Sequence, residues 1–194
     1  MKTVKVVIHK TLEIKQSKFI AYLCPIKEYA NLLQHLKNEH PKARHFVTAS
    51  RYLNEYDQIV ESSSDDGEPK GTSGKPSLKV IQGNELINSA VIIIRYFGGT
   101  KLGTGGLVRA YSDAVNDVIE ISEFETYVKL ESLLIQIPYS DLSKVEYWDE
   151  KCNIDGSDRE FIAEGVKLNL QGTKENLEKL KLAFTKNDVT YTYL

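Results

Sequence analysis

The chain has 194 residues, of which 41% are hydrophobic and 27% charged, an ordinary balance for a globular protein with one large domain or two small ones. The net charge of −2 excludes a protein that attracts nucleic acid through an overall basic field. Two widely separated cysteines, no signal peptide and no apolar run near the roughly 18 residues of a membrane span predict a cytoplasmic protein without a membrane partner.

The first sixty residues are predicted to form four strands and one helix, and they carry ten Lys or Arg against five Asp or Glu. Apolar residues from Tyr29 to Leu36 follow the i, i+3, i+4, i+7 spacing of one helix face, and the helix must end before Pro41. The predicted strands cover residues 4–8, 17–24, 45–53 and 56–61, and the last two form a hairpin that turns at residues 54–55.

The middle of the chain alternates between loops and regular structure. Residues 62–76 are rich in Ser, Asp, Gly and Pro without a periodic pattern, which indicates a loop, and residues 78–82 predict a short strand. Residues 90–97 are apolar on both faces for most of their length, so we expect a strand at the centre of a covered sheet. Apolar residues from Leu107 to Val118 predict a helix, and residues 121–126 a linker.

A second unit is predicted after this linker. Its expected elements are a strand at 127–138, a helix from Ser140 to about Lys151, a hairpin of 152–155 and 161–170 around Gly156, a helix that includes Phe184, and a strand at 189–194. The order β-α-β-β-α-β is that of a ferredoxin-like domain. The sequence therefore predicts an α+β protein with an N-terminal domain at residues 1–125 and a ferredoxin-like domain at residues 126–194.

Residues 98–106 form a glycine-rich turn between the predicted central strand and the helix that follows it. Backbone N–H groups and the helix dipole at such a turn favour an anion, and nearby cations add charge. A phosphate of RNA, of a nucleotide or of a ribosomal surface suits this turn, while the alternative is a tight turn whose cations are simply solvated. The candidate binding residues are Arg95, Gly98, Gly99, Lys101, Gly103, Gly105, Gly106 and Arg109.

The standard nucleotide signatures are missing, so no cofactor is predicted. The only Gly-Lys pair, Gly74-Lys75, is followed by Pro76 rather than by Ser or Thr, and the glycine-rich turn lacks the third glycine of the dinucleotide fingerprint. Lys75 remains a candidate for binding a ligand or partner, as one of the spaced cations in this part of the chain.

Asp65, Asp66 and Glu68 place three carboxylates within four residues. Carboxylates bind Mg²⁺ or Ca²⁺ and serve as acids or bases, but the spacing of a calcium loop is absent and no metal site is predicted. The alternatives are a contact with a partner, or a structural role in which the aspartates cap turns and Glu68 pairs with Arg95 or Lys101. We add His45 to the candidates because it precedes the hairpin that leads into this loop.

The segments at 64–76 and 95–111 resemble the IMPACT family, which includes the bacterial YigZ-like proteins and eukaryotic members linked to translational control. The resemblance is carried by Ser64-Asp65-Asp66-Gly67-Glu68-Pro69 and by the run from Arg95 to Tyr111. It implies an N-terminal domain with the ribosomal protein S5 domain 2-like fold and a C-terminal ferredoxin-like domain, a pair of folds also found in elongation factor G. Relatives usually show a His-Asn-Cys-like segment where this chain has His45-Phe46-Val47, which weighs against chemistry that requires the cysteine or the asparagine.

Three hypotheses about function remain open. The first is a non-enzymatic cytoplasmic protein that binds RNA or the ribosome and regulates translation, without a motif specific for DNA. The second is a hydrolase of peptidase or phosphoesterase type that uses the acidic loop with His45, with or without a divalent metal. The third is a protein–protein adaptor whose acidic loop contacts a basic partner.

Overall fold

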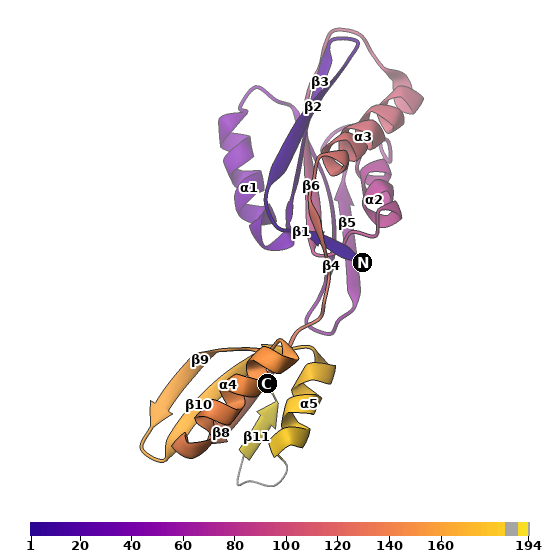
Figure 1. The fold of residues 1–194 in the computed structure, drawn as a ribbon. Helices are drawn as coiled ribbons and strands as arrows, with labels where there is room; N and C mark the ends of the chain where they lie inside the picture. The colour runs from indigo at the N-terminus through magenta and orange to yellow at the C-terminus, as the bar shows by residue number, and fades with distance from the viewer. Residues whose placement is uncertain (185–189, 194) are drawn as a thin grey trace. The chain divides into compact units, whose positions relative to one another are not determined.

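The computed structural model of the chain divides into two units, Met1–Tyr127 and Val128–Leu194 (Figure 1). The strand β6 (Ser89–Tyr96) lies at the centre of the first unit. The structure describes residues 1–184 and 190–193. Residues 90–94 of β6 are fully buried, because both faces of the sheet are covered. The prediction of a central, doubly covered strand is confirmed.

The other strands of the first unit are β1 (Lys2–Val4), β2 (Ile8–Ile14), β3 (Ser17–Pro25), β4 (His45–Leu53), β5 (Ile59–Ser64) and β7 (Phe124–Thr126). Its helices are α1 (Ile26–Glu39), α2 (Gly74–Gly83) and α3 (Gly103–Glu120). Five strands form an antiparallel sheet in the order β2-β3-β6-β4-β5, and β1 pairs separately with β7.

Helices lie on both faces of the five-stranded sheet (Figure 1). Val91 and Ile93 belong to a core that contains residues of α2 and α3, whereas Ile92 and Ile94 belong to a core beneath α1. Because successive side chains of a strand point to opposite faces, one run of apolar residues supplies both cores. This arrangement fixes the end of β6, where Arg95 and the glycine-rich turn follow.

In the first unit, residues 5–7 of the predicted strand 4–8 lie between β1 and β2, the hairpin of β4 and β5 turns over residues 54–58 rather than 54–55, and the predicted loop at 62–76 contains the end of β5 and the start of α2. Two further predictions are wrong because contacts distant in sequence decide the structure. Residues 78–82 belong to α2 rather than to a strand; the Asp65 carboxylate accepts hydrogen bonds from the backbone N–H groups of Ser73 and Gly74 at the start of this helix. The predicted linker at 121–126 contains β7, which pairs with β1 in the register Lys2 opposite Thr126.

The second unit contains the strands β8 (Glu131–Ile137), β9 (Asp155–Ile162), β10 (Gly165–Gly172) and β11 (Thr190–Tyr193), a short 3₁₀ turn η1 (Tyr139–Asp141), and the helices α4 (Leu142–Cys152) and α5 (Lys174–Phe184). The strands form an antiparallel sheet in the order β11-β8-β10-β9. The buried side chains of β8, β10, α4 and α5 make one core, separate from those of the first unit.

The predicted order of strands and helices in the second unit is found, but the hairpin around Gly156 is wrong. Gly156 lies inside β9, and the chain turns instead between Ile162 and Gly165. Residues 189 and 194, at the ends of the predicted last strand, lie outside the described residues. In the part of the chain that the structure describes, no helix is long and apolar enough to span a membrane.

Candidate functional site

Three neighbouring strands of the first unit present a row of side chains at one end of the sheet. Phe19 of β3 is paired with Arg95 of β6, and Arg95 is paired with His45 of β4. Paired residues of adjacent strands share a face; Phe19 belongs to the core formed with α3. The loop between β5 and α2 adds Glu68 to this row.

The centre of the site is a buried ion pair. Glu68 and Arg95 are only 8% and 7% exposed, and Glu68 Oε1 accepts hydrogen bonds from Arg95 Nη1 at 2.5 Å and from the Tyr111 hydroxyl at 2.9 Å. Burial and then the Glu68 carboxylate raise the pKa of Tyr111, so its hydroxyl stays protonated and donates. Of the two partners expected for Glu68, the structure selects Arg95.

Asp65 organises the loop rather than facing a ligand. Its carboxylate accepts hydrogen bonds from the N–H groups of Gly71, Ser73 and Gly74 and from the Ser73 hydroxyl. Burial acts to raise the pKa of Asp65, but these hydrogen bonds outweigh it and hold the pKa below its usual range. Asp65 therefore remains ionised and holds the loop against the first turn of α2.

Asp66 joins the loop to β4. Its Oδ2 accepts a hydrogen bond from the Phe46 N–H at 2.6 Å, and its carbonyl oxygen lies 2.8 Å from His45 Nδ1. A carbonyl oxygen only accepts, so Nδ1 of His45 must carry the proton. The other ring nitrogen, Nε2, lies 4.0 Å from Glu68 Oε1. The three carboxylates thus point to different partners and do not converge.

The glycines of the glycine-rich turn after β6 differ in how closely other atoms pack against them. A Cβ on Gly98 would lie 2.0 Å from backbone atoms of Gln16, and the Gly98 N–H donates to the Ser17 hydroxyl. Gly98 is therefore required by close packing against the β2–β3 turn. A Cβ on Gly105, in the first turn of α3, would meet open space, so packing does not require glycine there.

A pocket of about 350 Å³ lies in front of the N-terminus of α3. It is lined by residues from the acidic loop, β6, the glycine-rich turn and α3, namely Glu68, Pro69, Arg95, Phe97, Lys101, Leu102, Gly103, Thr104 and Leu107. The first turn of α3 has no acidic residue, and no side chain caps it. Its free N–H groups and the positive end of the helix dipole therefore favour an anion.

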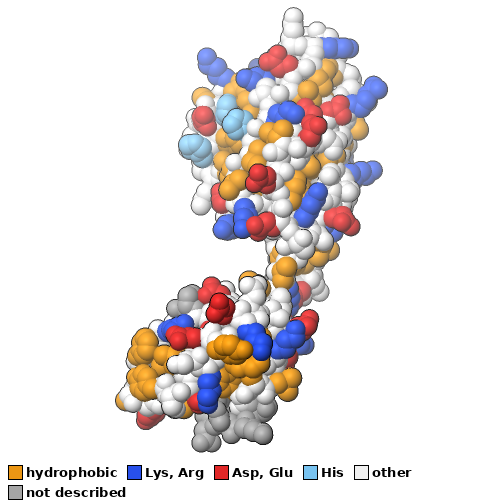
Figure 2. All heavy atoms as spheres, viewed as in Figure 1, with side chains coloured by type: hydrophobic (Ala, Val, Ile, Leu, Met, Phe, Trp, Pro, Cys, Tyr) orange, Lys and Arg blue, Asp and Glu red, His pale blue; other side chains and the backbone are white. Residues whose placement is uncertain are grey.

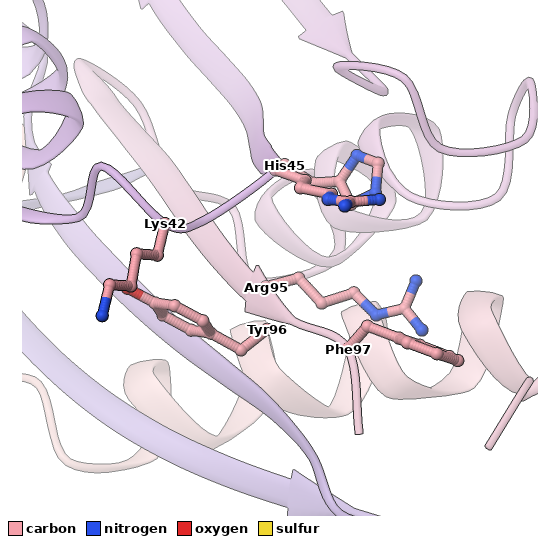
Figure 3. Close-up of a pocket in the computed structure, with 6 residues that line it drawn as sticks. Lys42, His45, Arg95, Tyr96 and Phe97 are labelled. Carbon is pink, nitrogen blue, oxygen red and sulfur yellow. The ribbon is translucent and has the colours of Figure 1, made fainter. Parts of the chain in front are cut away.

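A second pocket, of about 410 Å³, is lined by Lys42, Arg44, His45, Arg95, Tyr96 and Phe97 (Figure 3). Figure 3 shows the Arg95 side chain between His45 and the ring of Phe97. Arg95 and Phe97 thus line both pockets. Sequence reasoning missed Lys42, Arg44, Tyr96 and Phe97 as site residues. For Lys42 and Arg44 the signal was only the overall basic excess of the first sixty residues, whereas Tyr96 and Phe97 lie in the run from Arg95 to Tyr111 that resembles the family.

The remaining candidates are not gathered in these two pockets. Lys75 lines a separate groove between α2 and α3 together with Lys79, and Arg109 is exposed on α3. Gly99 has a positive φ of 86° in the turn, and Gly106 follows Gly105 in α3. Figure 2 shows basic and acidic side chains interspersed over the visible face of the first unit, so this face presents no continuous basic patch.

Titratable side chains do not form a metal centre in the described residues, where no three His, Cys, Asp or Glu side chains are grouped as ligands. Burial raises the pKa of Cys24 to about 12, so this thiol stays protonated.

Comparisons with known proteins agree on one family. Residues 15–119 match the model of the Impact N-terminal domain. An IMPACT family member of Haemophilus influenzae is 36% identical over 81% of this chain and 76% of its own length, and the IMPACT family member YigZ of Escherichia coli is 34% identical over 73% and 71%. A crystal structure of a hypothetical protein is 28% identical and superposes with a TM-score of 0.70 over 100% of this chain and 96% of that one.

Proposed function

The chain belongs to the IMPACT family, and from this premise we propose that it is a non-enzymatic protein that binds RNA or the translation machinery and takes part in regulating translation. One observation carries the proposal: an uncapped helix N-terminus, Lys101 and the buried Arg95 line the same pocket. An RNA phosphate is an anion that such a pocket accommodates.

The charges around this pocket support an anionic ligand. Glu68 is compensated by Arg95, which leaves Lys101 as the exposed charge at the pocket and the α3 N–H groups as free donors. Arg95 Nε is buried without a hydrogen-bond partner among the described residues. An anion that enters this pocket would therefore meet the α3 N–H donors and the Lys101 ammonium group, while the Glu68 carboxylate is already neutralised by Arg95.

The same contacts favour binding over hydrolysis. A carboxylate that acts as a base or holds a metal must have oxygen lone pairs free for substrate or ion. Here Asp65, Asp66 and Glu68 accept hydrogen bonds from the chain's own N–H, hydroxyl and guanidinium groups. These bonds stabilise the loop, which supports the structural interpretation of the acidic residues.

We also propose the finer folds that the family resemblance implies. The strand order β11-β8-β10-β9, with α4 and α5 contributing to a single core, supports a ferredoxin-like second unit. The antiparallel sheet with α2 and α3 on one face supports an S5 domain 2-like first unit.

The test is binding of the purified protein to ribosomes, by co-sedimentation, and to labelled RNA, by fluorescence anisotropy, between about 50 and 200 mM salt. Affinity is expected to fall with a log–log slope near −0.7 to −0.9 for each phosphate contacted. Lys101→Ala should weaken binding and reduce the slope by roughly one contact. Lys174→Ala removes the same charge from an exposed site on α5 and is the matched control.

A protein that binds neither ribosomes nor RNA at the lowest salt contradicts the proposal. Capture of a basic protein that survives nuclease treatment, without RNA binding, would point instead to the adaptor hypothesis. Binding that ignores salt would contradict the phosphate contact, because counterion release is unavoidable when phosphates are neutralised.

A further inference from the structure

We propose that the two pockets that share Phe97 form one site for single-stranded RNA, in which a base stacks on Phe97 and successive phosphates bind in the two pockets. This inference rests on the proposed function and names the form of nucleic acid that the site takes. It follows from the exposed ring, from the two pockets that share it, and from the positive groups in each.

Phe97 is an exposed aromatic ring that contacts the buried Arg95 side chain. It is 58% exposed directly after the end of β6. The Arg95 guanidinium lies over the Phe97 ring at 5.8 Å and over the buried Phe19 ring at 5.5 Å. Figure 3 shows the Phe97 ring alongside the Arg95 side chain. A ring supported in this way loses little further freedom when a base stacks on it.

The pocket on the β4 side of Phe97 supplies unneutralised positive charge. Lys42 and Arg44 are exposed, and neither forms an ion pair with a described carboxylate. His45 adds a ring nitrogen, and no carboxylate is among the six residues that line this pocket. Because Lys42 and Arg44 line this pocket and no carboxylate does, the pocket fits a phosphate better than a neutral ligand.

The pocket on the α3 side supplies the second phosphate position. Lys101, Gly103 and Thr104 line it, next to the uncapped first turn of α3. Arg95 is nine-tenths buried, lines both pockets, and has an Nε without a partner in the described chain. Arg95 and Phe97 therefore belong to the lining of both proposed phosphate positions.

This arrangement fits a single strand rather than a duplex. An aromatic ring stacks only on a base that has left its helix, whereas a duplex presents phosphates and grooves. Duplex binding depends on an extended basic surface, and in Figure 2 the charges on the visible face of the first unit are interspersed. The positive groups used here lie close to one exposed ring, as a short unpaired segment requires.

The first experiment measures fluorescence anisotropy with a labelled ten-nucleotide oligouridylate and with an RNA duplex of the same length. The wild-type protein is expected to bind the single strand more tightly. Phe97→Leu keeps an apolar side chain but removes the ring, and should weaken single-strand binding about 5- to 150-fold with an unchanged salt slope. Phe161→Leu is the matched control, since Phe161 is 64% exposed in the second unit.

Two further variants separate stacking from charge. Lys42→Ala with Arg44→Ala should reduce the salt slope by up to about 1.4, two contacts to a single strand, while Lys27→Ala with Lys174→Ala removes two exposed charges elsewhere. Phe97→Trp in a Trp148→Phe background places the only tryptophan at the site. Its fluorescence should be quenched by the oligouridylate if a base stacks on it.

Equal affinity for duplex and single strand, or wild-type affinity of Phe97→Leu, overturns this inference while leaving the proposed function standing. Absence of quenching at saturating oligouridylate overturns it as well. Failure of the wild-type protein to bind either RNA at about 50 mM salt contradicts the inference, and it contradicts the proposed function only if the protein also fails to co-sediment with ribosomes. Unchanged melting temperatures of the variants establish that the measured losses concern binding.

Discussion

At the scale of single residues, Glu68 is the side chain on which the site depends. It neutralises Arg95, accepts the Tyr111 hydroxyl and lies 4.0 Å from His45. An isolated buried guanidinium is unfavourable, so Arg95 can occupy this position only while Glu68 is present. The same pair keeps the base of both pockets rigid and leaves their exposed cations free.

Glu68→Gln should therefore destabilise the first unit by about 3 kcal/mol, because Arg95 stays buried without a compensating charge. Urea unfolding followed by far-ultraviolet circular dichroism measures the loss. Glu123→Gln, at an exposed site, should leave stability unchanged. The urea midpoint followed by the fluorescence of Trp148, which lies in the second unit, should also be unchanged. A Glu68→Gln protein as stable as wild type would contradict the role assigned to this ion pair.

At the scale of elements, α4 and β9 meet at a buried carboxyl. Asp149 is 8% exposed, and a Cβ on Gly156 would lie 2.2 Å from its Oδ2, so a larger residue at position 156 would displace this carboxyl. Burial raises the pKa of Asp149 from 3.8 to about 6; Arg159 opposes this shift, and Glu146 and Asp155 add to it. The carboxyl is therefore protonated in the folded unit under mildly acidic conditions.

The raised pKa makes the second unit more stable in mild acid. The folded state holds a proton that the unfolded state releases, so the extra stability is full below about pH 4 and is lost as the pH rises through about 6. Between these limits the free energy of unfolding should fall by about 1–3 kcal/mol. Trp148 is the only tryptophan and lies on α4, so its fluorescence in urea follows this unit.

Asp149→Asn is the matched variant for this pH series, since it cannot ionise. Its unfolding midpoint should change less than that of the wild-type chain between pH 4.5 and about 7.5. Parallel pH dependence in the two proteins would assign the effect to other groups.

At the scale of the whole molecule, the cores of the two units share no residue. The first unit, residues 1–127, has one apolar cluster on each face of its five-stranded sheet, and the second unit has a single cluster of its own. Each unit buries its own apolar surface, which is the main requirement for folding independently. The proposed RNA site is contained in the first unit.

A fragment of residues 1–127 is therefore expected to fold without the rest of the chain. A dispersed amide proton spectrum and a cooperative thermal transition are the measurements. A collapsed spectrum, with the second unit needed to restore it, would contradict the independence of the two cores.

The sequence predicts most reliably what neighbouring residues determine. β6 and α3 follow from apolar patterns within each segment, whereas α2 was missed because a carboxylate at Asp65 caps it from outside the segment. β7 was missed because its partner strand begins at Lys2. In the site, Lys42 and Arg44 gave no local signal, since exposed cations are common on any surface; only the folded chain brings them beside Phe97.

The pairing of β1 with β7 also has a consequence for how the chain is made. Lys2 bonds to residues 85 and 87, Met1 accepts a hydrogen bond from Tyr127, and Lys2 stands opposite Thr126. During synthesis, residues 1 and 2 must wait for nearly the whole unit before all of their partners have been made. The N-terminal strand thus closes the unit last, and the nascent first unit reaches its complete hydrogen bonding only after Tyr127 has been added.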